Sequence, residues 1–241
     1  MNAERLAGFL DHASIDPDVL ELRPDYRVLL IAVSGIEPAP GDTHSEQLLR
    51  SAERRARRLL AERPAEQLPH VSAWREAYRA FGAKPQRTRN SLEALLRRVE
   101  TGLPRVNRLT DIYNAISVQH LIPLGGEDLD HYVGPPRLAR AIGTEPFGTV
   151  AGGEPIIEHP EVGEVVWRDD EGVTCRRWNW RQTTRTQLRD DTSAALFILD
   201  ALAPCTDDAV RDAADDLLAH LVQASPNLIA ARRLIAAAKS P

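Results

Sequence analysis

The sequence predicts a single α+β domain, spanning residues 1–241, in which a mixed β-sheet is flanked by helices at both ends of the chain. Three patterns support this: an apolar β-branched run near the start, a hairpin signal in the second half, and helical periodicity around both. With 241 residues, 43% of them apolar and 27% charged, the chain is long enough for one sizeable core. No run approaches the ~20 apolar residues of a membrane span, so we expect neither a membrane protein nor disorder.

The first half predicts one strand followed by helices. Residues 26–36, YRVLLIAVSGI, form a short apolar run that predicts a buried strand. Apolar residues at helical spacing predict helices over 43–63 and along the stripe 71–81. A third helix is expected over 90–102, where Asn90 is followed three residues later by Glu93, as in a capping box. The segment 109–122 fits a fourth helix.

The second half combines turns, strands and helices. Residues 123–136, PLGGEDLDHYVGPP, are rich in turn formers, and RLARAIG at 137–143 is typical of a strand. The segment 163–180 alternates around DDEG and is the strongest hairpin signal in the chain.

The C-terminal part is expected to return to helix. The three predicted helices cover 191–202, 207–222 and 228–238, with Pro204 and Pro226 as breaks between them.

The charge of the chain is distributed unevenly. The formal net charge is −5, yet residues 50–108 hold fifteen Arg or Lys against six Glu and no Asp. Clustered arginines suit phosphate, because the planar guanidinium donates hydrogen bonds in a fork and counterion release adds affinity for nucleic acid. The alternative is a solvated helix face. The expected RNA-binding residues are Arg54, Arg57, Arg58, Arg87 and Arg89.

Several common chemistries lack their motifs. The sequence has no P-loop, no GxGxxG after a strand, no HExxH and no GxSxG, and its seven histidines include no pair at metal-binding spacing. We therefore expect no cofactor and no metal. The acidic N-terminal stretch does not suit a signal peptide, and two cysteines are too few for a disulfide framework, so a cytoplasmic location is expected.

The middle of the chain resembles a known editing module. It carries, in order, DIYN, DLD, RLARA, GGE and the hairpin that leads into TTRTQLRDDTSAALFILDAL. From about Ser91 to Leu202 this order is similar to the B3/B4 domain of the bacterial phenylalanyl-tRNA synthetase beta chain, which hydrolyses tyrosine wrongly attached to the phenylalanine tRNA. The resemblance implies a freestanding B3/B4-type protein with its core over about 89–202, an N-terminal strand and helices over 26–88, and C-terminal helices over 206–238.

The resemblance also implies a substrate pocket. Asn114 matches the Asn that lines the editing pocket, and the facing wall falls at WNWRQT, residues 178–183. The expected pocket residues are Asp111, Tyr113, Gly125, Gly126, Trp178, Asn179, Trp180, Arg181 and Thr183. Asn114 and Asp128 are the expected catalytic residues, because ester hydrolysis needs a positioned water and donors for the oxyanion. A turn or N-cap role is the alternative for Asp128, and a turn role is the alternative for Thr183.

The WNWRQT wall has two possible orientations. If it is a strand, Trp178 and Trp180 face one side, while Asn179 and Arg181 face the other. One of these pairs would then line the pocket, or the tryptophans would be buried against the helices.

Two departures from the synthetase affect substrate choice. Gly125 stands where the synthetase has a pocket His, and Leu196 to Ile198 are apolar where the synthetase has the Glu that recognises the tyrosine hydroxyl. Discrimination depends on paired polar groups, so we expect a small or polar aminoacyl group in place of tyrosine.

Three functions follow from these observations. The first is an aminoacyl-tRNA deacylase that edits in trans, with aminoacyl-tRNA as its partner. The second is a binding module that keeps the pocket for an amino acid without hydrolysing an ester, and the third is a protein-interacting adaptor. Salt-sensitive tRNA binding would separate the first from the others. The amino acid, the tRNA and the oligomeric state stay open at this point.

Overall fold

The computed structural model describes residues 1–237 and confirms the α+β class. Short 3₁₀ turns lie at Ala65–Gln67 and Leu129–His131. The helices are α1 (Ala3–Asp11), α2 (Pro17–Leu22), α3 (Thr43–Glu62), α4 (Pro69–Ala80), α5 (Ser91–Leu96), α6 (Arg108–His120) and α7 (Asp207–Ala224). The strands are β1 (Ser14–Ile15), β2 (Arg27–Ser34), β3 (Leu124–Asp128), β4 (Arg137–Arg140), β5 (Phe147–Ala151), β6 (Glu154–Glu158), β7 (Val165–Arg168), β8 (Val173–Arg176), β9 (Arg181–Gln182), β10 (Ala194–Ala201) and β11 (Ile229–Ala236).

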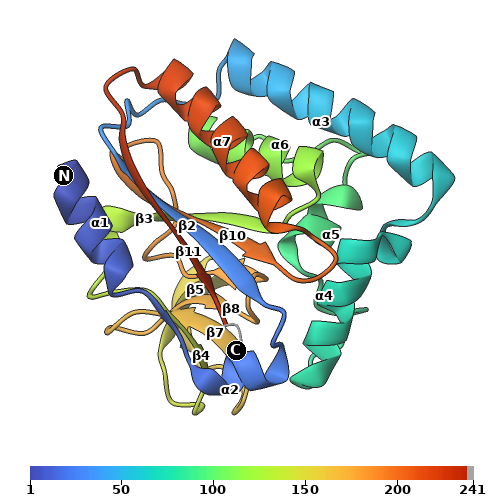
Figure 1. The fold of residues 1–241 in the computed structure, drawn as a ribbon, viewed down its shortest axis with the longest axis vertical. Coiled ribbons are helices and arrows are strands. Elements are labelled where there is room, and N and C mark those ends of the chain that lie inside the picture. The colour runs from blue at the N-terminus through green and yellow to red at the C-terminus, as the bar shows by residue number, and fades with distance from the viewer. Residues whose placement is uncertain (238–241) are drawn as a thin grey trace.

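A four-stranded sheet in the order β11-β2-β10-β3 forms the centre of the molecule. Alternate residues of β2 point to opposite faces, so Leu30 joins the core between this sheet and the five-stranded sheet β1-β4-β7-β8-β9, while Ile31 joins the core beneath α6 and α7. Figure 1 shows α6 and α7 over one face of the central strands and β4, β7 and β8 on the other side. Burial on both faces explains why residues 28–33 of β2 are all apolar.

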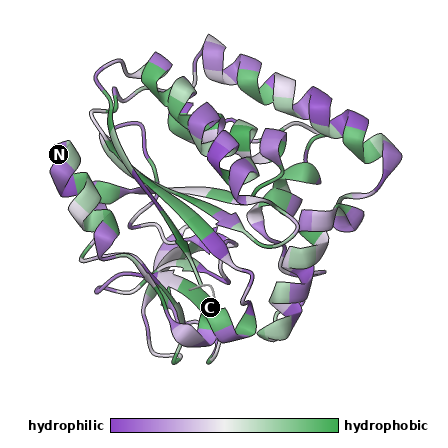
Figure 2. Ribbon diagram, in the orientation of Figure 1, coloured by the Kyte–Doolittle hydropathy of each residue, from purple (hydrophilic) through white to green (hydrophobic). Residues whose placement is uncertain are grey.

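The helices predicted over 43–63, along the stripe 71–81 and over 109–122 are confirmed, whereas the helix expected over 90–102 is shorter, because α5 ends at Leu96 and turns follow. Asp42 and Ser45 form a capping box at the start of α3, Asn90 caps α5, and Asn107 caps α6. Helices α3 to α6 share a third core that includes Leu49, which is fully buried. In Figure 2 hydrophobic colour dominates the central strands, whereas hydrophilic segments recur along α3. The strand at β2, the strand at β4 and the β7–β8 hairpin are also confirmed.

The helix predicted over 191–202 is wrong, because Ala194–Ala201 form β10. This strand pairs with β2 on one side and with β3 on the other, and all eight of its residues are buried. A strand buried on both faces has no polar alternation, so its pattern resembles that of a buried helix. Its partner β3 lies in the segment that was expected to be turns.

The helix predicted over 228–238 is also wrong. Ile229–Ala236 form β11, which pairs with β2 in antiparallel register, and residue 238 lies outside the described residues. The composition of this segment, rich in Ala, Leu and Arg, favours helix. Pairing with an available sheet edge outweighs this propensity, because propensities are small compared with the energy of tertiary contacts.

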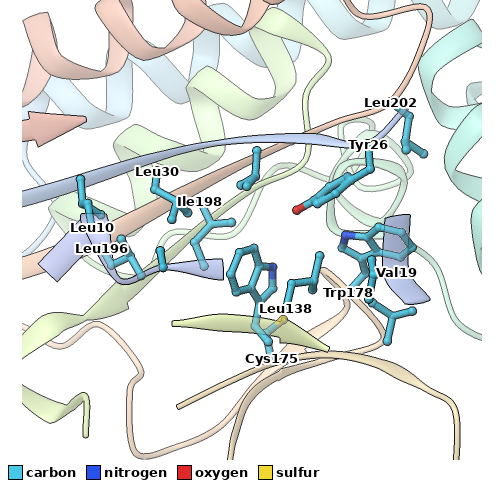
Figure 3. Close-up of a cluster of buried hydrophobic side chains, with 14 of the residues drawn as sticks. Leu10, Val19, Tyr26, Leu30, Leu138, Cys175, Trp178, Leu196, Ile198 and Leu202 are labelled. Carbon is cyan, nitrogen blue, oxygen red and sulfur yellow. The ribbon is translucent and has the colours of Figure 1, made fainter. Parts of the chain in front are cut away.

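The WNWRQT segment is not the regular strand that alternation predicts. Arg177 and Trp178 adopt positive φ of 47° and 68°, so the chain turns before β9 begins at Arg181. Trp178 is therefore fully buried, where it contacts Tyr26, whereas Trp180 is half-buried. Figure 3 shows Trp178 and Cys175 within the buried cluster between the two sheets.

Within residues 1–237, no helix has both the length and the apolar character that a bilayer crossing requires.

Candidate functional site

A cavity of about 280 Å³ lies where α5 and α6 meet the two larger sheets. Its walls come from segments far apart in the sequence, and half of the lining side chains are apolar or aromatic. The lining residues are Ser91, Ala94, Leu95, Arg98, Pro104, Tyr113, Asn114, Leu124, Gly125, Glu127, Trp167, Cys175, Trp178, Asn179, Trp180, Gln182, Ile198 and Asp200. A concave site that combines apolar and aromatic walls with convergent polar groups is typical of a small-molecule pocket.

Burial separates the mouth of the cavity from its deep end. At the mouth, Ala94 and Arg98 on α5 and the adjoining segment are exposed, and Trp180 is half-buried. At the deep end, Trp167 and Asp200 are each 1% exposed. The deep end is thus enclosed by the two sheets, and a ligand reaches it past α5.

Helix α6 supplies Tyr113 and Asn114 to one wall. The cap at Asn107, whose side chain accepts from the Thr110 backbone N–H at 2.9 Å, fixes where this helix begins. Asn114 is 7% exposed, so its carboxamide faces the cavity and not bulk water. Tyr113 stacks edge-on against Phe197, and burial raises the pKa of its phenol to about 12. Tyr113 is therefore neutral at physiological pH.

Glu127 on β3 is a buried carboxyl group that lines the cavity. Its Oε2 accepts a hydrogen bond from the Tyr132 hydroxyl, and among the described residues its Oε1 has no hydrogen-bond partner. The residue has 0% exposure. Burial raises the pKa of this carboxyl to about 7, against the lowering effect of Tyr132 and Thr174.

Asp200 on β10 is the second buried carboxyl group of the cavity. It accepts from the Tyr26 hydroxyl at 2.6 Å and from the Asn179 side-chain amide at 3.2 Å, while the Asn179 amide oxygen accepts from the Tyr78 hydroxyl at 2.9 Å. Burial raises the pKa of Asp200 to about 7, and the hydrogen bonds only partly oppose it. Asn179 thus connects α4 to the floor of the cavity.

The structure brings six of the predicted site residues to this one cavity. They are Tyr113, Asn114, Gly125, Trp178, Asn179 and Trp180.

Two predicted acidic residues lie elsewhere. Asp128 accepts from the Asp130 backbone N–H at 3.0 Å and from the Thr192 hydroxyl at 2.7 Å, which is the capping role given as the alternative. Asp111 accepts from the Val106 backbone N–H at 2.8 Å and borders a separate hollow near Arg105. Both carboxylates hold local backbone in place.

Gly126, Thr183 and Arg181 also lie outside the cavity lining. The carbonyl of Gly126 accepts from the Gln182 side chain at 2.8 Å, and a Cβ at Gly126 would come within 2.8 Å of Leu188 on the other face of the sheet. The Thr183 hydroxyl donates to the Gly148 carbonyl at 2.9 Å. The Arg181 guanidinium pairs with Glu158 and lies 4.8 Å from the Trp180 ring centroid.

The predicted RNA-binding arginines differ in their surroundings. Arg54 and Arg58 are exposed and border a surface hollow on α3 together with Arg55. Arg57 instead donates from Nε and Nη2 to the Val99 carbonyl, at 2.9 and 2.6 Å. Between α4 and α5, Arg87 is exposed, while Arg89 lies 3.7 Å from Glu93.

Glu127 and Asp200 are the site residues that the sequence analysis missed. Glu127 lies in a Gly-rich segment that predicted turns, and Asp200 lies in the segment that predicted a helix. One signal was present: Asp200 interrupts the apolar run ALFILDAL. A charged residue inside such a run is either paired or functional, because burying it costs free energy.

The chain has recognisable similarity to one protein family and to solved structures. A search against curated proteins finds no match. Among solved structures, the N-terminal fragment of the phenylalanyl-tRNA synthetase beta-subunit from Pyrococcus horikoshii aligns with 13% identity and a TM-score of 0.43, over 92% of this chain and 49% of that one. The chain therefore spans about half the length of that fragment. A family model described as the B3/4 domain matches residues 73–223, which is more than half of the sequence. The chain belongs to the B3/4 domain family, as the resemblance implied.

Proposed function

We propose that this protein binds mischarged aminoacyl-tRNA and hydrolyses its ester in trans. The observation that carries this proposal is the cavity of about 280 Å³, which has Asn114 on one wall and a closed, largely aromatic deep end. A cavity of this size accommodates an amino-acid side chain. The sequence resemblance to the editing module supports a role for Asn114 at this place.

The proposed chemistry uses water and not a protein nucleophile. Burial raises the pKa of the Cys175 thiol well above its usual value, so the sulfur stays protonated and unreactive. An aminoacyl ester is activated enough for a positioned water to attack, provided that donors stabilise the oxyanion. In this proposal the Asn114 carboxamide and the backbone near Gly125 supply those donors, while the aminoacyl side chain occupies the deep end.

The tRNA would be held by the exposed arginines of α3. Arg54 and Arg58 are exposed, and the segment 50–108 has a net surplus of basic residues, with fifteen Arg or Lys against six Glu. Arginine contacts to phosphates release counterions, so binding of this kind weakens steeply as salt increases. The proposed location is the cytoplasm, where charged tRNA is available.

A second candidate function is binding of an amino acid without hydrolysis. Gly125 favours it, because this lining residue leaves the cavity without the imidazole that the resemblance places there in the synthetase pocket. Tight binding of an aminoacyl group with no turnover would support this candidate.

The test is a deacylation screen over tRNAs charged with different amino acids. Each charged tRNA is incubated with the protein, and loss of the ester is compared with the spontaneous rate. The proposal expects accelerated hydrolysis for a small set of amino acids and binding to tRNA that weakens between low and moderate salt. Failure to accelerate any ester hydrolysis would contradict it and leave the binding candidate.

A further inference from the structure

We infer that the deep end of the cavity selects a side chain with a positively charged head group, such as a primary ammonium. This inference deepens the proposed function and rests on it for the identity of the carrier, an aminoacyl-tRNA. It concerns Glu127 and Asp200, which the cavity encloses together.

One carboxylate oxygen of Glu127 has no hydrogen-bond partner among the described residues. Tyr132 donates to Oε2, but Oε1 is fully buried and has no partner among the described residues. Buried polar atoms are almost always hydrogen-bonded, and an unpaired one costs about 1–3 kcal/mol. Since Glu127 lines the cavity, a ligand that donates a hydrogen bond there would remove this cost.

Neutral groups and one ion pair surround Glu127. Thr174 on β8 and Tyr132 after η2 (Leu129–His131) are neutral, whereas the carboxylate of Asp169 raises the pKa of Glu127 and Arg185 lowers it. Asp200 on β10 is the second carboxyl group of the cavity, and the field of Glu127 helps to raise its pKa. Beyond them, Arg185 already pairs with Asp169 at 2.7 Å. Among the described residues, the arginine whose field reaches Glu127 is therefore already paired with another carboxylate.

Positive charge in the cavity lining lies away from the buried carboxyl groups, at the mouth. Among the residues that line the cavity, Arg98 is the basic one, and it is exposed at the mouth. The deep end thus holds two carboxyl groups without a counter-ion. A cationic ligand would allow both to ionise, whereas an apolar or anionic ligand would leave them protonated or repelled.

Aromatic side chains form much of the wall around the buried carboxyl groups. Trp167, Trp178 and Tyr113 line the same cavity, and aromatic ring faces attract a desolvated cation. The neighbouring Trp180 already attracts cations in this way, because the guanidinium of Arg177 lies 4.6 Å from its ring centroid. Carboxylates combined with aromatic rings favour an ammonium head over a neutral one of the same size.

The test measures binding of non-hydrolysable probes. Adenosine carrying a 3′-amide-linked lysyl group is compared, by titration calorimetry at pH 8, with adenosine carrying 2-aminoheptanoyl, in which a methyl group replaces the ammonium. We expect the lysyl probe to bind at least ~10-fold more tightly, a difference of about 1.4 kcal/mol. The preference should grow from pH 6 to pH 8, as Glu127 loses its proton.

Substitutions assign the preference to the carboxyl groups. Glu127→Gln should abolish most of the lysyl preference and its pH dependence, and Asp200→Asn should reduce it in the same direction. Glu161→Gln, at an exposed Glu in the loop before β7, is the matched control and should leave both probes unchanged. Circular dichroism checks that each variant folds, and the second carboxyl variant keeps the test decisive where the first does not fold.

The outcomes separate this inference from the proposed function. Equal binding of the two probes, a larger discrimination between tyrosyl and phenylalanyl probes, or no binding of any probe would overturn the inference. An ammonium preference without hydrolysis of any ester would support the inference and contradict the proposed hydrolase activity. Hydrolysis of several esters with no preference for a cationic side chain would support the proposed hydrolase activity and contradict the inference.

Discussion

The deep end of the cavity and the outer face of α3 treat carboxyl groups in opposite ways. In the cavity, burial raises the pKa of Glu127 and of Asp200 to about 7. On α3, hydrogen bonds from Arg105 and Arg50 lower the pKa of the half-buried Glu46 to about 2. One region withdraws acids from water without supplying cations, and the other surrounds acids with arginines.

The difference supports the cavity, and not the surface of α3, as the proposed site of the reaction. Hydrogen-bonded ion pairs on a helix surface contribute little to stability and are found in proteins of every function. Enclosed carboxyl groups without a counter-ion reduce stability, and they persist where a ligand or a reaction uses them. We therefore propose that substrate selection takes place in the cavity and that the arginines of α3 attract RNA by their charge.

The largest effect is expected for Asn114→Ala. Removing one donor to an oxyanion typically lowers the rate of hydrolysis by ~10²–10³. Deacylation of the best substrate should therefore fall by this factor, while tRNA affinity and the urea midpoint stay close to the unsubstituted protein. The exposed Asn227→Ala provides the matched control. Full activity in Asn114→Ala would contradict the proposed role of Asn114 in the hydrolysis.

The pH dependence of stability should identify the two cavity acids. Their pKa values in the folded protein, about 7, exceed the usual 4.5 of Glu and 3.8 of Asp that apply when the chain is unfolded. Between about pH 4 and pH 7 the folded protein binds more protons than the unfolded chain, so the free energy of unfolding decreases as pH rises, and the loss is complete above pH 7. His70 acts oppositely, because burial lowers its pKa to about 4.

Glu127→Gln isolates the acid contribution from that of His70. The neutral amide has no charge to bury, so at pH 8 this variant should be more stable than the unsubstituted protein by about 1–3 kcal/mol, while at pH 5 the two should be nearly equal. Urea unfolding at pH 5, 6.5 and 8 measures both curves. A variant curve parallel to that of the unsubstituted protein would show that Glu127 does not titrate in this range.

The elements that the sequence predicted correctly are those whose pattern is local. The helix at α3 shows a complete face of apolar residues and a capping box at Asp42, and the β7–β8 hairpin shows its turn at DDEG. Strands β10 and β11 depend on their partners instead. β10 is buried on both faces and β11 adds to the edge of β2, and neither condition is visible in a stretch of eight residues.

The candidate site shows the same division. Asn114 and Trp178 were found through a resemblance that depends on the order of short motifs. Glu127 and Asp200 became apparent only when β3 and β10 were paired, because the pKa of each depends on burial by other segments. The separation of Asp128 from the cavity likewise follows from its contact with Thr192, which lies 64 residues away in sequence.

Charge reversal on α3 should weaken RNA binding without changing the cavity. With Arg54→Glu and Arg58→Glu combined, tRNA affinity should fall at least ~10-fold, and the slope of log affinity against log salt should become shallower by about 2 if each arginine contacts one phosphate. Binding of the amide-linked probes should stay the same. Arg5→Glu on α1 is the control, because Figure 1 places α1 on the opposite side of the central sheet from α3. Unchanged tRNA affinity in the double variant would return these arginines to the role of solvated surface.

The smallest effect should distinguish Arg57 from its neighbours on the same helix. Both of its donating nitrogens bind the carbonyl of Val99, a residue with 0% exposure, and Glu53 lies within 3.8 Å. Arg57→Ala would leave this carbonyl without its partner, so the free energy of unfolding should fall by about 1 kcal/mol. This is the lower end of the usual cost of an unsatisfied buried group, because Arg57 is partly exposed and water can replace some of the lost contact. Arg54→Ala should leave stability unchanged and weaken tRNA binding instead. The opposite outcome would be that Arg57→Ala weakens tRNA binding as much as Arg54→Ala and unfolds at the same urea concentration as the unsubstituted protein. Arg57 would then be an RNA-binding residue, and its hydrogen bonds to Val99 would not contribute to stability.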